Sequence, residues 1–186
     1  YGRPMKYYQQ LQKFDVAGNF LFAFGSSGTA EGQLDGPAYL AFDAAGNLWV
    51  TESRNDRIQQ FDANGNFLQM WGWGVATGAD QFEICTSGCL KGKVGGGDGQ
   101  FDDPLGIAID DTGNLYVAND GDDYQKFASN GTFIYKVENF PGAGSSPDYL
   151  YDIAFNAAGN LYLTGEEGAV YIFDQDGNFV NTVMIQ

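Results

Sequence analysis

The chain has 186 residues and a formal net charge of −15, from 9 Lys and Arg against 24 Asp and Glu. A protein that binds nucleic acid through its phosphates needs a basic surface, so this composition argues against a nucleic-acid partner. No run of 18 apolar residues occurs, and we therefore predict no membrane span; the length is enough for one domain with a sizeable core.

Two kinds of β-hairpin alternate along the chain. The first kind, called the c–d hairpin, opens the sequence at Tyr8–Gly25, and the second kind, called the a–b hairpin, follows at Pro37–Glu52. Each holds a glycine in its turn, because glycine adopts the positive φ of a tight hairpin turn at little cost. The c–d hairpin recurs at 57–72, 124–135 and 170–180, and the a–b hairpin recurs at 104–119 and 151–165.

The spacing of these hairpins is that of propeller blades. One phenylalanine of the c strand recurs at intervals of 47, 66 and 46 residues, as Phe14, Phe61, Phe127 and Phe173. A repeat of about 46 residues built from four short strands has the size of a β-propeller blade. The a and b strands are apolar on both faces, as in Leu40-Ala-Phe42, which is typical of sheets covered on both sides.

The repeated pattern also resembles a known family. The a–b hairpin at Pro104–Val117 and the Arg-Ile-Gln-x-Phe run at Arg57–Phe61 resemble the NHL repeat of six-bladed β-propellers. The resemblance covers the chain except about residues 73–100. It implies an all-β propeller segment of about three and a half four-stranded blades. The predicted parts are a half-blade at 1–25, a blade at 26–72, an insertion loop at 73–103, and blades at 104–140 and 141–186.

Three and a half blades are too few to close a ring. We therefore expect further propeller blades, either from the same protein or from another chain. A second expectation follows from the apolar blade faces, which would be left open at each end of the arc and would favour association of the chain with copies of itself.

The two cysteines, Cys85 and Cys89, lie in the insertion loop. Two thiols without any histidine cannot complete a structural zinc site. We therefore predict a disulfide that closes a small loop, and with it an extracytoplasmic location: secreted, periplasmic or at the cell surface. A pair of free thiols in a cytosolic protein is the alternative.

Acidic residues gather at one end of the predicted blades. The d–a and b–c connections share this end, and 16 of the 24 acidic residues fall in them. Variable loops on a rigid scaffold often carry binding sites, and a negative field favours cationic partners. The predicted binding face consists of Glu52, Arg54, Asp56, Trp73, Asp102, Asp103, Asn119, Asp120, Asp122, Asp123, Asp152 and Glu166.

Calcium is the one cofactor that the sequence leaves open. Asp120, Asp122 and Asp123 are the candidate ligands, and a solvated acidic loop is the alternative. Asp62–Asn66 and Asp174–Asn178 resemble the start of a calcium loop. However, the distal glutamate is missing, and turn chemistry explains both segments.

Histidine is absent, which removes Ser-His and Cys-His nucleophile pairs and most zinc sites. The sequence therefore favours a non-catalytic binding or scaffold module that uses the acidic face to engage a protein or small ligand. One alternative is a structural subunit whose open arcs complete one another in an oligomer or filament. The other is a calcium-dependent, lactonase-like hydrolase with Glu52, Asn119 and Asp152 as ligands, so an enzymatic activity stays open.

Overall fold

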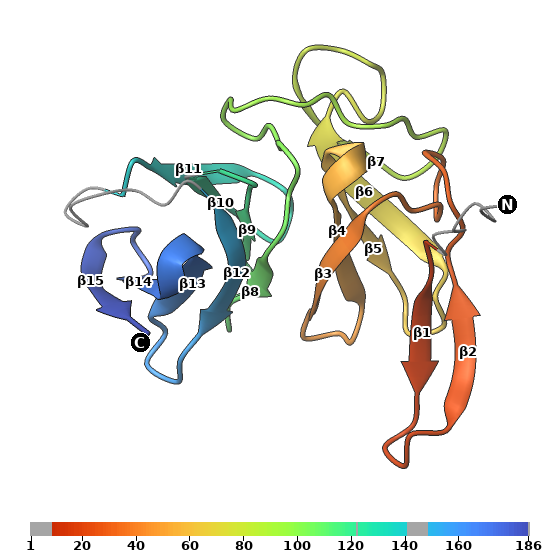
Figure 1. Cartoon of the computed structure of the whole chain (residues 1–186). Coiled ribbons are helices and arrows are strands. Elements are labelled where there is room, and N and C mark those ends of the chain that lie inside the picture. Colours follow the sequence, from red (N-terminus) through yellow and green to blue (C-terminus); the bar gives the residue numbers. More distant parts are fainter. Residues whose placement is uncertain (1–8, 122, 141–148, 186) are drawn as a thin grey trace, which may run out of the picture.

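A computed structural model describes residues 9–121, 123–140 and 149–185 (Figure 1). These residues contain fifteen β-strands and two short 3₁₀ helices. The elements are β1 (Leu11–Phe14), β2 (Phe20–Phe24), β3 (Pro37–Phe42), β4 (Leu48–Glu52), η1 (Ser53–Asn55), β5 (Arg57–Phe61), β6 (Phe67–Trp73), β7 (Phe82–Cys85), β8 (Ile107–Ile109), β9 (Leu115–Ala118), β10 (Asp123–Phe127), β11 (Phe133–Glu138), β12 (Leu150–Phe155), β13 (Leu161–Gly165), η2 (Glu166–Gly168), β14 (Ala169–Phe173) and β15 (Phe179–Met184).

The strands form four antiparallel sheets that follow the chain order, which confirms the predicted all-β fold. The first sheet holds β1 and β2, the second β3 to β7, the third β8 to β11, and the fourth β12 to β15. Within each sheet, strands that are consecutive in sequence are neighbours. The sheets meet through their first strands, since β3 contacts β8 and β8 contacts β12. Meanders joined at their inner strands are the arrangement of propeller blades, and Figure 1 shows them in sequence between the two chain ends.

The hairpin turns share one hydrogen-bond pattern. In the first turn, Asp15 Oδ1 accepts hydrogen bonds from the backbone N–H groups two and four residues later, and Asn19 Nδ2 donates to Asp15 Oδ2 at 2.9 Å. Gly18 completes the turn with a φ of 83°. The same carboxylate role recurs at Asp43, Asp62, Asp110 and Asp174. The oxygens of Asp62 and Asp174 are therefore used by their own turns, as predicted from turn chemistry.

The core lies between successive sheets. The fully buried Trp71 meets Trp49 with ring centroids 4.5 Å apart, and Phe127 of the third sheet at 6.3 Å. Between the third and fourth sheets, Tyr116 meets Phe155 edge-on at 4.9 Å. Each such ring removes about 150–250 Å² from water, so the contacts between sheets supply much of the stability. This packing explains why the inner strands are apolar on both faces.

The structure corrects the prediction that residues 73–103 form only a loop. β6 extends to Trp73, and β7 pairs with it antiparallel, so the second sheet has five strands. The physical reason is Phe82, whose ring stacks on Phe127 at 5.3 Å and meets Trp71 at 6.3 Å. This aromatic contact holds β7 against the outer edge of β6.

The predicted disulfide between Cys85 and Cys89 is present, with Cα atoms 5.7 Å apart. Both cysteines belong to the insertion and are buried in a cluster with Met70 and Val75. In the part of the chain that the structure describes, no helix has the length and apolar character needed to cross a lipid bilayer.

Candidate binding face

Four of the predicted residues lie together, and we call Asp56, Asp102, Asp103 and Asp120 the acidic cluster. The N–H of Asp103 donates to Asp56 Oδ1 at 3.3 Å. The N–H of Asp120 donates to the carbonyl oxygens of Asp102 and Asp103 at 3.1 and 3.2 Å. The cluster thus joins the connection between β4 and β5 to the segment before β8 and the loop after β9.

The carboxylates of the cluster act on one another electrostatically. Burial raises the pKa of Asp120, and the charges of Asp103 and Asp102 raise it further. Burial also raises the pKa of Asp56, although the N–H of Asp103 and the ammonium group of Lys91 oppose this. Lys91 Nζ lies 3.6 Å from Asp56 Oδ2. Because the charges of Asp103 and Asp102 raise the pKa of Asp120, a cation placed beside these carboxylates would be bound favourably.

The backbone of the cluster is held in a costly conformation. Asp56 and Asp103 have φ values of 50° and 43°, in the left-handed region that disfavours residues with a Cβ atom. The position of Asp103 is filled in the preceding repeat by Gly36, which has a φ of 62°. Aspartate at a position where glycine fits costs on the order of 1 kcal/mol. Such cost is common at functional sites.

Two glutamines, which the sequence reasoning missed, hold the segments that precede β3 and β8. Gln59 Oε1 accepts from the N–H of Gly32 at 3.0 Å, and its Nε2 donates to the carbonyl of Gln33 at 2.7 Å. Gln125 makes the same pair of bonds to the Gly99–Gln100 segment, at 2.7 and 2.6 Å. The signal was present in the sequence as a repeated Gly-Gln-apolar-Asp-x-Pro motif.

Glu52 does not belong to the binding face, contrary to the prediction. Its side chain is fully buried. Its carboxylate accepts hydrogen bonds from Arg57 Nε at 2.8 Å, Asn55 Nδ2 at 2.7 Å, the N–H of Asp35 at 2.9 Å and Gln59 Nε2 at 2.5 Å. The physical reason is the buried guanidinium, because an unpaired charge in the interior would be strongly unfavourable. The carboxylate is taken up by these buried contacts, and Glu52 is therefore not available as a calcium ligand.

Arg57 is the residue that the sequence reasoning overlooked here. Its guanidinium donates to the carbonyl oxygens of Ala30 at 3.2 Å and Gln33 at 3.0 Å, both in the loop before β3. It also donates to the carbonyl of Leu90, next to the disulfide, at 3.2 Å. One side chain therefore joins β5 to both neighbouring loops.

Asn119 is buried and positions the acids around it. Its Nδ2 donates to both carboxylate oxygens of Asp123, at 3.2 and 2.9 Å, and its Oδ1 accepts from the N–H of Asp102 at 3.3 Å. The third candidate metal ligand, Asp122, lies outside the described residues. Among the residues that are described, no group of three or more Cys, Asp or Glu side chains has a geometry that could hold a metal ion.

Arg54 and Trp73 have partners other than the cluster. Arg54 is exposed, and its Nη1 lies 3.5 Å from Asp35 Oδ1. Trp73 is half-buried at the end of β6, where it pairs with Phe82 of β7. Arg54 lies in η1, between β4 and β5, and Trp73 belongs to the structure of the insertion.

Asp152 lies in β12 of the fourth sheet, and Glu166 lies in η2, between β13 and β14 of that sheet. Asp152 is exposed, and its Oδ1 accepts from the N–H of Ile153 at 2.8 Å. Glu166 Oε1 lies 3.5 Å from the hydroxyl of Tyr151. Burial raises the pKa of Tyr151, and the charges of Glu166 and Asp120 raise it further. Tyr151 therefore lies within the electrostatic reach of both acids, which extends the acidic surface from the cluster toward the fourth sheet.

No protein-family model and no curated protein matches the chain. Solved structures do resemble it. One is a protein of unknown function from Bacteroides caccae, with 14% identity, a TM-score of 0.58, and coverage of 95% of this chain and 54% of that one. Others are U3-55K, with 14% identity and a TM-score of 0.59, and a putative exported protein from Bacteroides fragilis, with 12% identity and a TM-score of 0.56.

The likeness is to the fold alone. It supports the propeller-like arrangement of the four sheets. For both U3-55K and the Bacteroides fragilis protein, the match covers 86% of this chain and 42% of the solved chain. The chain therefore spans about half the length of the structures that it resembles.

Proposed function

We propose that the chain is a non-catalytic, NHL-type β-propeller module that binds a cationic segment of a partner protein through its acidic cluster. The observation that carries this proposal is Asp103, an acid in a left-handed conformation where the preceding repeat has Gly36. The substitution costs stability on the order of 1 kcal/mol and brings one more carboxylate beside Asp102 and Asp120. Cation binding would offset this cost.

The electrostatics of the cluster favour the same conclusion. Asp102 and Asp103 are exposed, so a ligand can reach them. Their charges raise the pKa of Asp120, and a bound ammonium or guanidinium group would reverse that effect. The net charge of −15 would also steer a basic partner toward the protein.

The proposal is tested with an octalysine peptide as the probe, titrated into the full chain by calorimetry at low and at physiological salt. We expect binding that weakens as salt rises, because exposed charges are screened. The Asp102→Asn/Asp103→Asn variant should bind about five- to tenfold more weakly, since each exposed charge contributes up to about 1 kcal/mol. Asparagine also tolerates the left-handed conformation, so this variant should fold.

The matched control is Asp111→Asn/Asp176→Asn, which removes two exposed charges from the hairpin turns at the other end of the blades. This variant should bind octalysine within about twofold of the original chain. An equal loss in both variants would show that the peptide responds only to net charge. That result, or no binding at low salt, would overturn the proposal.

We also propose an extracytoplasmic location. Disulfides persist in oxidising compartments, and the Cys85–Cys89 disulfide is buried within the fold. The Bacteroides fragilis protein that the structure resembles is described as a putative exported protein. Both observations agree with secretion, a periplasm or a cell surface.

A further inference from the structure

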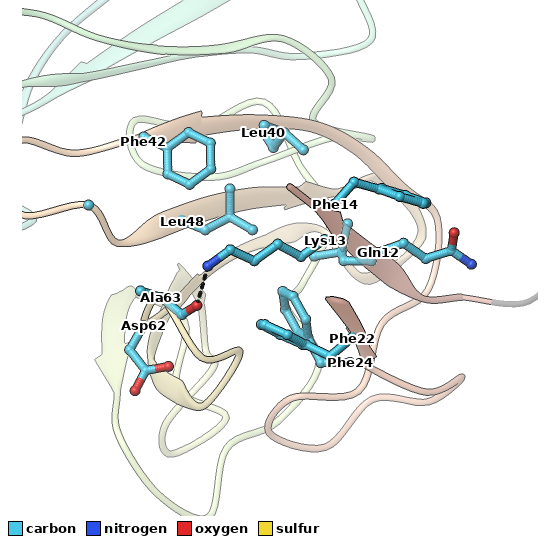
Figure 2. A pocket seen from close by; sticks show the side chains of 12 residues that line it. Gln12, Lys13, Phe14, Phe22, Phe24, Leu40, Phe42, Leu48, Asp62 and Ala63 are labelled. Carbon is cyan, nitrogen blue, oxygen red and sulfur yellow. Dashed lines mark hydrogen bonds between the residues drawn. The ribbon is translucent and has the colours of Figure 1, made fainter. Parts of the chain in front are cut away.

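An apolar groove lies between the β1–β2 hairpin and the second sheet (Figure 2). It has a volume of about 260 Å³. Its walls include Leu11, Phe14, Phe22, Leu40, Phe42 and Leu48. Its rim includes Gly46, Asp62 and Ala63 of the hairpin turns, so the groove opens toward the end of the blades opposite the acidic cluster.

The large side chains of strand β3 are more exposed than those of the equivalent strands in the next two sheets. The a strands β3, β8 and β12 carry a large side chain at the same position: Leu40, Ile107 and Ile153. Ile107 and Ile153 are each 4% exposed, whereas Leu40 is 51% exposed. Phe42 is 64% exposed, although the residues at its position in the other two a strands are half-buried. The apolar side chains of β3 are therefore those of a strand that another sheet covers, and the described residues provide no such cover.

Strand β1 shows the same contrast. The c strands β5, β10 and β14 each pair with a b strand on one edge and a d strand on the other, whereas among the described residues β1 pairs with β2 alone. The phenylalanine shared by these strands is 1% exposed at Phe61 and fully buried at Phe127 and Phe173, but 51% exposed at Phe14. The edge of β1 that faces the groove corresponds to the edge that binds a b strand in every other sheet.

The complete sheets show which side chains belong in the groove. Ile107 packs in one cluster with Ala41 of strand a and Trp49 of strand b of the preceding sheet. Ile153 likewise packs with Ala108 and Tyr116. Each large a-strand residue therefore meets a small a-strand residue and an aromatic b-strand residue. By the same rule, Leu40 and Phe42 require an alanine-like side chain and an aromatic ring.

A lysine in strand β10 gives an independent indication of the aromatic ring. Lys126 Nζ donates to the carbonyl of Gln175, in a turn of the next sheet, at 3.0 Å. It also lies over two rings: Tyr135 of strand d at 5.4 Å, and Tyr116 of strand b at 4.9 Å. The cation is thus held by one carbonyl and by aromatic rings from two strands.

Lys13 occupies the same position in β1 and has the first two of these contacts. Its Nζ donates to the carbonyl of Ala63 at 2.8 Å, as the dashed line in Figure 2 shows, and lies over Phe22 of β2 at 5.4 Å. The contact that corresponds to Tyr116, from a b strand, has no counterpart among the described residues. Lys13 therefore faces the place where an aromatic b-strand residue belongs.

We propose that this groove binds a β-hairpin of the a–b type, supplied by polypeptide outside these 186 residues. Its b strand would pair antiparallel with β1 and place an aromatic ring over Lys13. Its a strand would set a small residue against Leu40. A second copy of the chain is a poor source, because its a–b hairpins, β3–β4, β8–β9 and β12–β13, are each paired within their own sheets.

The test uses a cyclised 16-residue peptide with the sequence of Pro104–Asn119, carrying a fluorophore, added to the full chain. We expect saturable binding by fluorescence anisotropy. Hydrogen exchange should slow at the amides of β1 on addition of the peptide and stay unchanged at β15. No binding, or binding that leaves β1 unprotected, would overturn the proposal.

Three variants sharpen the result. Phe42→Asp, at an exposed position that should not affect folding, is expected to weaken binding tenfold or more. A peptide with Tyr116→Ala should lose at least as much, because Lys13 then has no ring to meet. Val183→Asp, at an exposed apolar position on β15, is the matched control and should leave binding unchanged. Equal losses in Phe42→Asp and Val183→Asp would overturn the proposal.

Sedimentation of the chain without peptide tests whether a second copy of the chain occupies the groove. If a second copy filled the groove, the original chain would dimerise and Phe42→Asp would be monomeric. That outcome would replace the hairpin with a homodimer and overturn the proposal. We expect both chains to sediment alike.

Discussion

At the scale of single residues, the pair Glu52 and Arg57 shows how one blade differs from its repeats. The equivalent positions of the third sheet are Asn119 and Asp123, where the amide donates to the carboxylate. The fourth sheet has glycine and alanine at these positions. A blade therefore folds without a buried ion pair. In the second sheet the pair serves to fix the loops on both sides of β5.

Arg57→Met should lower the free energy of unfolding by about 3–5 kcal/mol, because it leaves the carboxylate of Glu52 buried without its cation. The double variant Glu52→Gln/Arg57→Met should lose less than Arg57→Met alone, since no charge then stays buried. Urea denaturation followed by tryptophan fluorescence measures both. A double variant that is less stable than Arg57→Met would contradict this account of the pair.

The candidate site could be predicted from the sequence only in part, and the reason lies at this scale. Asp102 and Asp103 follow from the position of the acids in the repeat, because the connections of a meander share one end. The burial of Glu52 does not follow from that rule, because it depends on the guanidinium of Arg57 and on loop carbonyls far away in the sequence. The repeat predicts which residues stand at the ends of the strands. Whether such a side chain points into the interior or toward solvent depends on its hydrogen-bond and ion-pair partners in the folded chain.

At the scale of elements, β7 and the disulfide loop form a cover on the second sheet. The carboxylate of Glu31, in the loop before β3, accepts hydrogen bonds from the N–H groups of Gly88 and Cys89. The next residue, Leu90, accepts from Arg57. The cover is therefore joined both to the strand edge and to the loop beside it.

Reduction of the Cys85–Cys89 disulfide should lower the free energy of unfolding by about 2 kcal/mol, the chain-entropy value for so short a loop. The effect should be local, with faster hydrogen exchange in β7 and little change in β10. Urea denaturation and hydrogen exchange of the Cys85→Ser/Cys89→Ser variant measure the two parts. Equal acceleration in β10 would show that the disulfide supports the whole molecule instead of this cover.

The hairpins could be predicted because their signals are local. Each turn has its own glycine, and the aspartate that opens most of the turns bonds to residues two and four positions later. β7 could not be predicted in this way, since the described residues of the other sheets include no counterpart of it. It forms because Phe82 meets rings from two different sheets, Trp71 and Phe127, which only the folded chain brings together.

At the scale of the whole molecule, the four sheets form a propeller-like arc, and the two ends of its blades carry different surfaces. The acidic cluster lies at the end of the blades where the b–c connections run. The groove beside β1 opens toward the hairpin turns and is apolar. A charged, exposed face and an open apolar groove suit different partners, and the two proposals can therefore be tested separately.

We infer that β1 belongs to an incomplete blade with an open edge. Hydrogen exchange of the 186-residue chain at low concentration tests this directly by comparing the four c strands. We expect the amides on the unpaired edge of β1 to exchange about a hundredfold or more faster than the equivalent amides of β5, β10 and β14, because exposed edges open locally at little cost. Equal protection of all four strands would contradict the claim.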